Sequence, residues 1–479
     1  MEYEAVIGLE THAELATETK LFCGCGTRFG AEPNSQTCPV CIAMPGVLPV
    51  MNRKAFEYAL KVALALNCQI RPTTRFDRKN YYYPDLPKNY QISQNCTNLG
   101  TDGYLDLQVD GQMRRVGITN VHLEEDAGKS IHPEEAGSDF SLIDLNRAGI
   151  PLLEIVTAPD MRSAAEVDAY MQTLRNTLLY LGVSECKMQE GDLRFEASIS
   201  VRPKGATQLG NRVEVKNLNS MKAVVGAVEH EIERQTEILR QGGTVARETR
   251  LWDEVRGCTE RMRSKEEAHD YRYFPEPDLV QVEIHEQWLA DIRAGIPELP
   301  LARRRRFTEQ LGLSEYDASI LAESHELADY FEACLRCHNA PKPVANWIAN
   351  DVLRELKEQR KTPTEFVVKP DMLAALVKLV EDGTISVAGG REVFAEMCKT
   401  GQPPQAIVEA RGLAQVSDSD ALNKAVVDAL RAHPAVVADY RRGKKNAGAF
   451  IVGQIMKATK GKANPKVVSD LVRQHLDKA

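Results

Sequence analysis

The sequence has no long apolar segment. None of its 479 residues lies in a run of eighteen or more apolar side chains, which excludes a membrane-spanning helix. Residues 1–8 include two glutamates and lack both the basic start and the apolar stretch of a secretory signal. The composition, 43% hydrophobic and 27% charged, excludes a fibrous or disordered chain. We therefore expect a cytoplasmic protein with about three domains.

The two commonest phosphate-binding loops are also missing. No Gly-x-Gly-x-x-Gly pattern occurs in the chain. The segment 127–130, Ala-Gly-Lys-Ser, resembles the end of a P-loop, but Leu123 stands where that loop requires its first glycine. If a nucleotide binds to this protein, other residues must hold its phosphates.

The charge is distributed unevenly along the chain. The net charge is −8, yet residues 441–479 contain ten Lys and Arg against two Asp, so the remaining 440 residues carry −16. An acidic body with a basic tail is typical of proteins that contact a polyanion. A solvated pair of amphipathic helices would give the same composition, and both interpretations stay open at this point.

Four of the eleven cysteines form a cluster. Cys23 and Cys25 are separated by twelve residues from Cys38 and Cys41, and the other seven cysteines show no comparable spacing. In a reducing compartment such short-spaced pairs favour a metal over disulfides. Four thiolates can surround a structural zinc ion and leave no position open for catalysis. The alternative is a loop of free cysteines from which the metal has been lost.

Strand and helix patterns divide the chain into three parts. Alternating strand patterns and two long helical patterns mark the first part, whereas helical periods alone follow the proline-spaced segment 295–300. The sequence predicts an α+β body with a mixed or antiparallel sheet, a helical domain and a small basic helical tail. The expected bounds are 1–294, 295–404 and 405–479; the two helices of the body are expected at 163–181 and 220–242, and its strands around residues 6, 121, 142, 193 and 213.

Several of these strands carry acidic residues on one face. In the segment 5–14 a period of two places Glu10 and His12 together, opposite apolar neighbours. The same alternation puts Asp192, Arg194, Glu196 and Glu214 on polar faces, and His-Leu-Glu-Glu-Asp at 122–126 adds three consecutive carboxylates.

A carboxylate-rich sheet face has two explanations. An antiparallel sheet with one solvated face accounts for any single strand. Repeated carboxylates with His12 and few lysines are explained better by a divalent cation, because like charges repel unless a cation lies between them. Mg²⁺ binds carboxylate oxygens together with substrate phosphates, so the pattern also predicts a nucleotide site.

Two loops combine aromatic and basic residues. The segment 76–91 contains four tyrosines with three basic residues, and the segment 270–278 contains aromatics, Arg272 and prolines. Such loops can stack a base or ribose and contact phosphate. They can equally be proline-stiffened loops that pack their own aromatic rings.

At these segments the body closely resembles the B subunit of the aspartyl/glutamyl-tRNA amidotransferases, and the tail resembles the tail domain of the same family. The resemblance covers nearly the whole chain. It is carried by VIGLETHAEL, CPVCIAMPGVLPVMN, FDRKNYYYPDLPKNYQISQ, HLEEDAGKS, DLNRAGIPLLEIVTAPD, RVEVKNLNS and MRSKEEAHDYRYFPEPDL between residues 6 and 279, and by FIVGQIMKATKGKANP in the tail.

The resemblance implies a glutamine-hydrolysing ligase and a cradle-shaped body similar in fold to glutamine synthetase. The side-chain carboxylate of Glu-tRNA(Gln) or Asp-tRNA(Asn) is activated by ATP as an acyl phosphate. Ammonia released from glutamine by the amidase, or A, subunit then displaces the phosphate. The B subunit is the kinase and transamidase part of a heterotrimer, which the small C subunit braces.

The resemblance also implies roles for particular residues. The catalytic, ATP and metal site consists of Glu10, His12, Glu124, Glu125, Asp192 and Glu214, with Glu10, His12 and Glu125 as magnesium ligands. Strict alternation separates Glu124 from Glu125, so either the strand ends there or one of the two serves the ammonia path. Lys79 resembles a residue that pairs with an acidic group near the channel exit.

The cysteine cluster and the tail receive roles in the same way. The four cysteines match the family's zinc-bearing variant, although Ile42-Ala43 replaces the more usual Leu-Gly, which we expect to affect the turn rather than metal binding. The tail is expected to contact the tRNA backbone through contacts that depend on salt. Its predicted contacts are Arg441, Arg442, Lys444, Lys445, Lys457, Lys460, Lys462 and Lys466.

Two other functions compete with this interpretation. A stand-alone ATP-dependent amide ligase would use the acidic sheet face but has no need of a basic tail. A non-catalytic zinc-bearing RNA-binding module would use the cysteines and the tail but leaves the acidic face unexplained.

Overall fold

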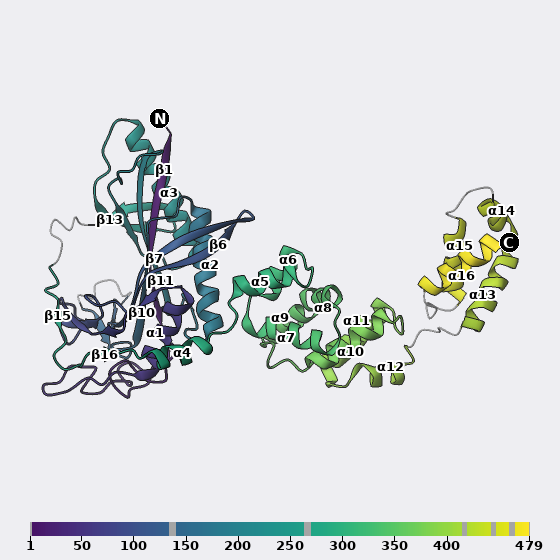
Figure 1. The fold of residues 1–479 in the computed structure, drawn as a ribbon, viewed down its shortest axis with the longest axis horizontal. Helices are drawn as coiled ribbons and strands as arrows, with labels where there is room; N and C mark the ends of the chain where they lie inside the picture. The colour runs from purple at the N-terminus through teal and green to yellow at the C-terminus, as the bar shows by residue number, and fades with distance from the viewer. Residues whose placement is uncertain are drawn as a thin grey trace. The chain divides into compact units, whose positions relative to one another are not determined.

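A computed structural model describes residues 2–133, 140–262, 270–413, 419–441, 447–458 and 465–478 (Figure 1). The chain forms two compact units, Met1–Ala302 and Arg303–Ala479. Among the described residues no helix combines the length and the apolar character that a membrane crossing requires.

A large mixed sheet forms the centre of the first unit. Its main path runs β14-β13-β12-β11-β1-β10-β7-β5-β4-β15, with β6 paired to β7 and β2 paired to β6. The pairs along this path are antiparallel except for β12 and β13, which are parallel. The strands are β1 (Tyr3–Glu14), β2 (Gln69–Ile70), β3 (Thr73–Thr74), β4 (Asp77–Asn80), β5 (Tyr90–Ser93), β6 (Gly100–Val109), β7 (Gln112–Glu125), β8 (Lys129–Ile131), β9 (Leu142–Asp144), β10 (Pro151–Thr157), β11 (Leu193–Pro203), β12 (Val213–Lys216), β13 (Glu248–Asp253), β14 (Cys258–Arg261), β15 (Phe274–Pro275) and β16 (Val282–Glu283).

The apolar face of this sheet is covered by helices. Ile7 and Leu9 of β1 are buried in one core with residues of α1 (Arg53–Ala65), α2 (Ala164–Leu181) and α3 (Met221–Arg240). The unit ends with α4 (Glu286–Ala294). Because side chains alternate along a strand, burying one face of β1 leaves Glu10 and His12 on the other. The predicted strands and both predicted helices are confirmed.

The cap of α2 shows why the helix begins where the sequence predicts. Ser163 is the N-cap, and its hydroxyl accepts a hydrogen bond from the Glu166 amide at 3.2 Å. The Glu166 carboxylate accepts in turn from the amide of Arg162 at 2.6 Å, one residue before the cap. Gly182 ends the helix in the left-handed conformation, with φ of 65°.

Helices alone make up the described part of the second unit. One core includes buried residues from Phe307 to Val408, and a second includes residues from Leu422 to Leu476. The helical pattern after residue 341 is interrupted by a short π-helical segment, η1. The elements are α5 (Pro300–Glu309, which begins at the end of the first unit), α6 (Glu315–Leu321), α7 (His325–Cys337), α8 (Pro341–Trp347), η1 (Ile348–Val352), α9 (Leu353–Gln359), α10 (Pro370–Glu381), α11 (Val387–Thr400), α12 (Pro404–Arg411), α13 (Ser419–Ala432), α14 (Pro434–Arg441), α15 (Ala447–Ala458) and α16 (Pro465–Lys478).

The prediction of a mixed α and β chain built on a large mixed sheet is confirmed. The division into three domains stays a prediction. Ile407 and Val408 of α12 are buried in the first helical core, so a C-terminal truncation after Leu413 would leave the residues of that core in place.

Candidate active site and cysteine cluster

Three neighbouring strands bring two histidines to one carboxylate. The antiparallel register pairs His12 of β1 with Glu154 of β10, and Glu154 with His122 of β7. The Nε2 atoms of both histidines lie 3.4 Å from Oε2 of Glu154. All three side chains therefore stand on the same face of the sheet.

Two more carboxylates complete this group. Oε1 of Glu10 lies 3.5 Å from Nε2 of His12, and the Glu124 carboxylate lies 3.8 Å from each histidine. Oε2 of Glu124 is buried and has no hydrogen-bond partner among the described residues. We call Glu10, His12, His122, Glu124 and Glu154 the acidic cluster.

The acidic cluster has the donor set of a cation site. Glu10, His12 and Glu154 offer three ligand atoms within 4.8 Å of one another, and His122, Glu124 and Glu154 offer three more. Carboxylate oxygens suit Mg²⁺, and imidazole suits transition metals. Oε2 of Glu124 lies 3.8 Å from His122 but accepts no hydrogen bond from the described residues, which gives an independent reason for a cation, because a buried charged oxygen without a hydrogen bond is costly.

Burial and mutual charge shift the titration of the acidic cluster. Burial, together with the charge of Glu154, raises the pKa of Glu10 to about 7. Burial acts to lower the pKa of His122, but Glu154 and Glu124 outweigh it and raise this pKa to about 10. The pKa of His12 is raised in the same way, against burial, by its hydrogen bond to Glu154 and the charge of Glu124. The raised pKa values favour protonated histidines beside the carboxylates, and a bound cation would compete with those protons.

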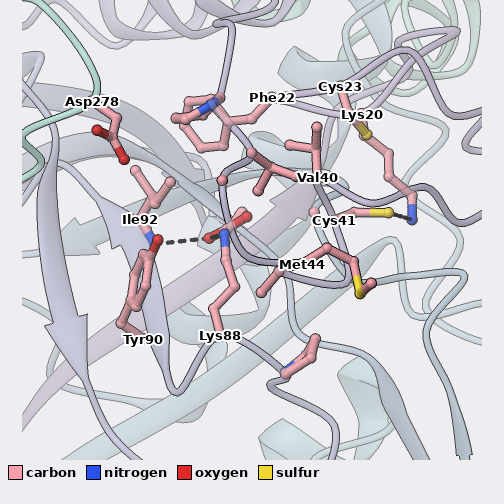
Figure 2. A pocket seen from close by; sticks show the side chains of 17 residues that line it. Lys20, Phe22, Cys23, Val40, Cys41, Met44, Lys88, Tyr90, Ile92 and Asp278 are labelled. Atoms are coloured by element: carbon pink, nitrogen blue, oxygen red, sulfur yellow. Dashed lines mark hydrogen bonds and ion pairs between the residues drawn. The ribbon is translucent and has the colours of Figure 1, made fainter.

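Glu125 lies in a different environment from its neighbour Glu124. Its carboxylate forms an ion pair with Lys88 and accepts the amide of Ile92 at 2.9 Å. It lines a cavity of about 270 Å³ that is also bordered by Lys20 and Cys41 (Figure 2). The cavity joins the surroundings of Glu125 to the cysteine loop.

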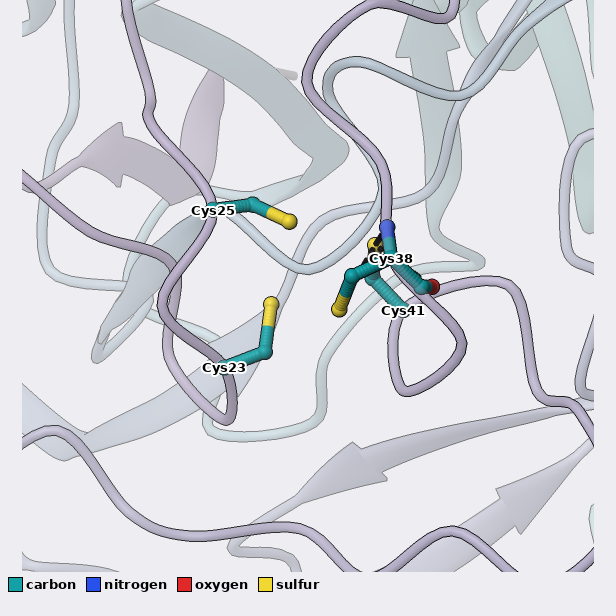
Figure 3. A group of neighbouring side chains, drawn as sticks. All are labelled: Cys23, Cys25, Cys38 and Cys41. Carbon is teal, nitrogen blue, oxygen red and sulfur yellow. Dashed lines mark hydrogen bonds between the residues drawn. The ribbon is translucent and has the colours of Figure 1, made fainter.

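The four predicted cysteine ligands converge (Figure 3). Their sulfur atoms all lie within 4.8 Å of one another, and those of Cys38 and Cys41 are 3.9 Å apart. A tetrahedral zinc site with Zn–S bonds of about 2.3 Å has sulfurs about 3.8 Å apart. A hydrogen bond from Cys23, with the nearby charge of Lys20, lowers the pKa of Cys41 to about 4. The residues fit a Cys₄ metal site.

The two aromatic loops meet, although they are far apart in sequence. Strand β15 pairs with β4, and Asn80 donates its amide to the Tyr271 carbonyl at 3.0 Å. The Lys79 ammonium lies 5.2 Å from the centre of the Tyr271 ring and 5.9 Å from that of Tyr81. Burial raises the pKa of Tyr81, with a further contribution from the charge of Glu124.

Comparison with known proteins shows the family to which this chain belongs. Residues 5–290 match the family model described as the GatB/GatE catalytic domain, and residues 329–476 match the GatB domain. The B subunit of the aspartyl/glutamyl-tRNA(Asn/Gln) amidotransferase of Carboxydothermus hydrogenoformans is 53% identical over 478 residues, which cover 100% of this chain and 99% of the relative. The proteins of the same name from Moorella thermoacetica and Geotalea daltonii are 55% and 54% identical, each over 99% of this chain and 100% of the relative. The chain belongs to this amidotransferase B-subunit family.

The acidic cluster of this B-subunit family member includes three of the residues that the sequence predicted. Glu10, His12 and Glu124 are brought together. Their partners His122 and Glu154 were not predicted. His122 stands in the quoted segment HLEEDAGKS, and Glu154 is the one charged residue in the apolar strand Pro151–Thr157, which is a signal that could have identified it.

The other predicted residues lie elsewhere in the family fold. Asp192 lies beside Glu14, whose amide donates to the Asp192 carbonyl at 2.8 Å, and it forms a separate acidic group with Glu185 and Glu190. Glu214 pairs with Ser198 across β12 and β11. Among the described residues the lysine that pairs with Glu125 is Lys88, whereas Lys79 contacts tyrosine rings.

Most of the predicted tRNA contacts of this family member cannot be placed. Lys457 is exposed near the end of α15. Arg442, Lys444, Lys445, Lys460 and Lys462 lie outside the described residues, and Arg441 and Lys466 are described only as members of α14 and α16.

Proposed function

We propose that this chain is the kinase and transamidase subunit of a tRNA-dependent amidotransferase. It phosphorylates the side-chain carboxylate of Glu-tRNA(Gln), Asp-tRNA(Asn) or both with ATP. It then transfers ammonia to the acyl phosphate and forms Gln-tRNA(Gln) or Asn-tRNA(Asn). The observation that carries this proposal is the acidic cluster on the sheet of a chain whose whole length matches B-subunit relatives.

The acidic cluster is proposed as the site of phosphoryl transfer. Glu10, His12, Glu124, His122 and Glu154 hold Mg²⁺ when it is bound, and the ion neutralises charge on the transferred phosphoryl group. The rigid antiparallel register of β1, β10 and β7 keeps these side chains in place before substrate arrives. Asp192 and Glu214 are proposed to extend the ATP site along the same face.

The cavity that contains Glu125 is proposed to serve the second half of the reaction. Glu125 and Lys88 form an ion pair at the cavity of about 270 Å³, on the other side of β7 from Glu124. Such a pair can orient an entering ammonia molecule and accept or return its proton. Lys79, which lies between the rings of Tyr81 and Tyr271, is proposed to lie next to the acyl phosphate of the substrate.

The remaining proposals concern the assembly. The glutaminase, or A, subunit supplies ammonia, and the C subunit braces a cytoplasmic heterotrimer. The body has a cradle shape similar to glutamine synthetase, and the helical domain and basic tail contact the tRNA away from its acceptor end. Cys23, Cys25, Cys38 and Cys41 hold a structural zinc ion, which is supported by the convergence of their sulfur atoms.

A transamidation assay tests the function. The chain is co-purified with its candidate A and C subunits and supplied with ATP, Mg²⁺, glutamine and Glu-tRNA(Gln), with Asp-tRNA(Asn) in parallel. ATP-dependent Gln-tRNA or Asn-tRNA is the expected product. The variant Asp106→Asn, which removes an exposed ion pair with Arg115 on another part of the sheet, should match the parent.

The assay also separates the competing functions. Amidation of free glutamate or aspartate without tRNA would support a stand-alone amide ligase. An assembled complex that hydrolyses glutamine and binds tRNA but forms no product with either tRNA would contradict the proposal and support an RNA-binding module.

A further inference from the structure

Lys20 is a fully buried lysine beside the cysteine cluster. Its exposed fraction is 0%, the lowest value a side chain can have. Its ammonium contacts two acceptors, the sulfur of Cys41 at 3.6 Å and the carbonyl of Leu145 at 3.3 Å. Figure 2 shows the ammonium directed at the Cys41 sulfur from the wall of the cavity.

A buried ammonium needs a negative partner. Removing a charge from water is costly unless an opposite charge lies close to it. Across the described ranges no carboxylate lies within ion-pair distance of the Lys20 ammonium, and a backbone carbonyl is neutral. The sulfur of Cys41, at 3.6 Å, is therefore the contact of the ammonium that can carry negative charge when a metal is bound.

A metal-bound cysteine cluster would supply the negative charge that a buried ammonium requires. Four thiolates around one Zn²⁺ ion leave two negative charges in excess, and a hydrogen-bonded ammonium reduces that excess by one. Cys41 accepts a second hydrogen bond from the Cys38 amide at 3.1 Å. Among the hydrogen bonds of the described residues, Cys41 is the cluster sulfur that accepts from both an ammonium and a backbone amide.

Lys20 also contacts the first cysteine pair, Cys23 and Cys25, through its backbone. Its backbone amide donates to the Cys25 carbonyl at 3.0 Å, while its side chain reaches Cys41. The neighbouring residue Leu21 donates its amide to the Gly149 carbonyl at 2.8 Å. Lys20 thus contacts both cysteine pairs, and its ammonium also contacts Leu145 in the segment that precedes β10.

We infer that Lys20 is a positioning residue of the metal site, whose ammonium orients the Cys41 sulfur by a hydrogen bond and compensates charge of the zinc–thiolate cluster. This inference rests on the proposed zinc site and deepens it. It is independent of the proposed reaction with tRNA.

Metal binding by full-length variants tests the inference. Zinc affinity is measured by competition with a chromophoric chelator for the parent, Lys20→Met, Lys20→Arg and the control Lys61→Met. Lys61 also donates to a carbonyl, that of Leu181 at 2.7 Å, but contacts no cysteine. We expect Lys20→Met to weaken zinc binding by about 10- to 100-fold, because outer-shell partners of metal ligands have effects of that size. Lys20→Arg should recover much of the affinity, and Lys61→Met should match the parent.

Two further readouts exclude a merely structural role. In the Co²⁺-substituted protein, Lys20→Met should move the thiolate-to-metal charge-transfer band to longer wavelength, because the sulfur loses a hydrogen bond. In calorimetry, Lys20→Met should lower the Tm of the zinc-loaded protein but not that of the chelator-stripped protein.

The outcomes are distinguishable. A parent chain that binds no zinc contradicts the zinc site itself. A parent that binds zinc while folded Lys20→Met binds it equally well, or an equal loss of Tm with and without zinc, overturns the role of Lys20 and leaves the zinc site standing. If Lys20→Met does not fold, Lys20→Arg decides the question. A Lys20→Arg variant with the zinc affinity and cobalt spectrum of the parent supports the role of Lys20. A Lys20→Arg variant that binds zinc as weakly as a cysteine-to-serine variant overturns that role.

Discussion

Glu124 and Glu125 are adjacent in sequence but have different contacts. Glu124 lies 3.8 Å from His12 and from His122, whereas Glu125 accepts the amide of Ile92 at 2.9 Å and pairs with Lys88. Their side chains leave β7 on opposite faces because successive residues of a strand alternate. The two carboxylates can therefore be tested independently.

Under the proposed function, substitution of these two residues has different effects. Glu124→Gln should reduce tRNA-dependent ADP formation by at least about 100-fold, because the acidic cluster loses a buried charge. Glu125→Gln should leave most ADP formation and reduce the amidated tRNA formed per ADP. Both products are quantified in single-turnover assays. If Glu125 is instead a magnesium ligand, as the resemblance implies, the two variants will lose ADP formation alike.

The buried Glu231 of α3 should make the first unit sensitive to acid. Its carboxylate accepts hydrogen bonds from Nε and Nη2 of Arg234 at 2.9 Å each, from the Gln235 side-chain amide at 2.9 Å and from the Thr259 hydroxyl at 2.5 Å. Burial alone raises its pKa, but these hydrogen bonds outweigh burial and lower the pKa below 4.5. Because the folded-state pKa is depressed, its contribution to stability is complete above about pH 4.5 and is lost as the pH falls through the lowered value.

Urea unfolding of Glu231→Gln measures this contribution, with tryptophan fluorescence as the probe, because one of the three tryptophans, Trp252, packs on α3. At pH 7 we expect the variant to lose about 3 kcal/mol of unfolding free energy, because a buried ion pair loses one partner. The difference from the parent should shrink as the pH falls below 4.5. The exposed neighbour Glu233→Gln is the control and should stay within about 0.5 kcal/mol at every pH. A pH-independent difference for Glu231→Gln would contradict the assigned pKa direction.

Ala43 adopts a strained backbone conformation in the cysteine loop. Its φ is 60°, in the left-handed region, where a side chain costs about 1–2 kcal/mol. Replacing it with glycine releases this strain but adds entropy to the unfolded chain, and the net result should be a free energy of unfolding higher by about 0.5–1 kcal/mol.

Calorimetry of the full chain checks this, with Ala31→Gly as the control from the same loop. Ala31 is not among the residues with positive φ, so its replacement should destabilise by a similar amount. A lower Tm for Ala43→Gly would show that the turn does not release strain at that position.

The basic tail should bind tRNA with marked salt dependence. Deleting residues 414–479, which spares the buried Ile407 and Val408, should weaken tRNA binding and flatten the dependence of log Kd on log salt concentration. Glutaminase activity of the assembled complex should be unchanged.

A single substitution refines this test. Lys457→Gln should reduce the salt slope by about one. Lys424→Gln, an exposed lysine of α13 outside the predicted contact set, is the control and should leave the slope unchanged. Equal Michaelis constants for tRNA in the truncated and full-length enzymes would argue against a tail contact.

Local patterns were enough to predict much of the fold and part of the site. The alternation in residues 5–14 correctly placed Glu10 and His12 opposite a buried face, and Ser163 and Gly182 correctly marked the ends of α2. The spacing of the four cysteines predicted the cluster that the structure brings together. These features depend on neighbours within a few residues, where strand period, capping and turn geometry act.

Only the tertiary structure identified the complete acidic cluster. His12 is more than a hundred residues away from His122 and Glu154 in the sequence. Their contact depends on the register of β1, β10 and β7. In the same way, Lys20 has no periodic or motif signal, and its role follows from a buried contact with Cys41. Sequence alone determined which residues face the same way along each strand, whereas strand register and loop packing decided which of them meet, because those are set by contacts between distant segments.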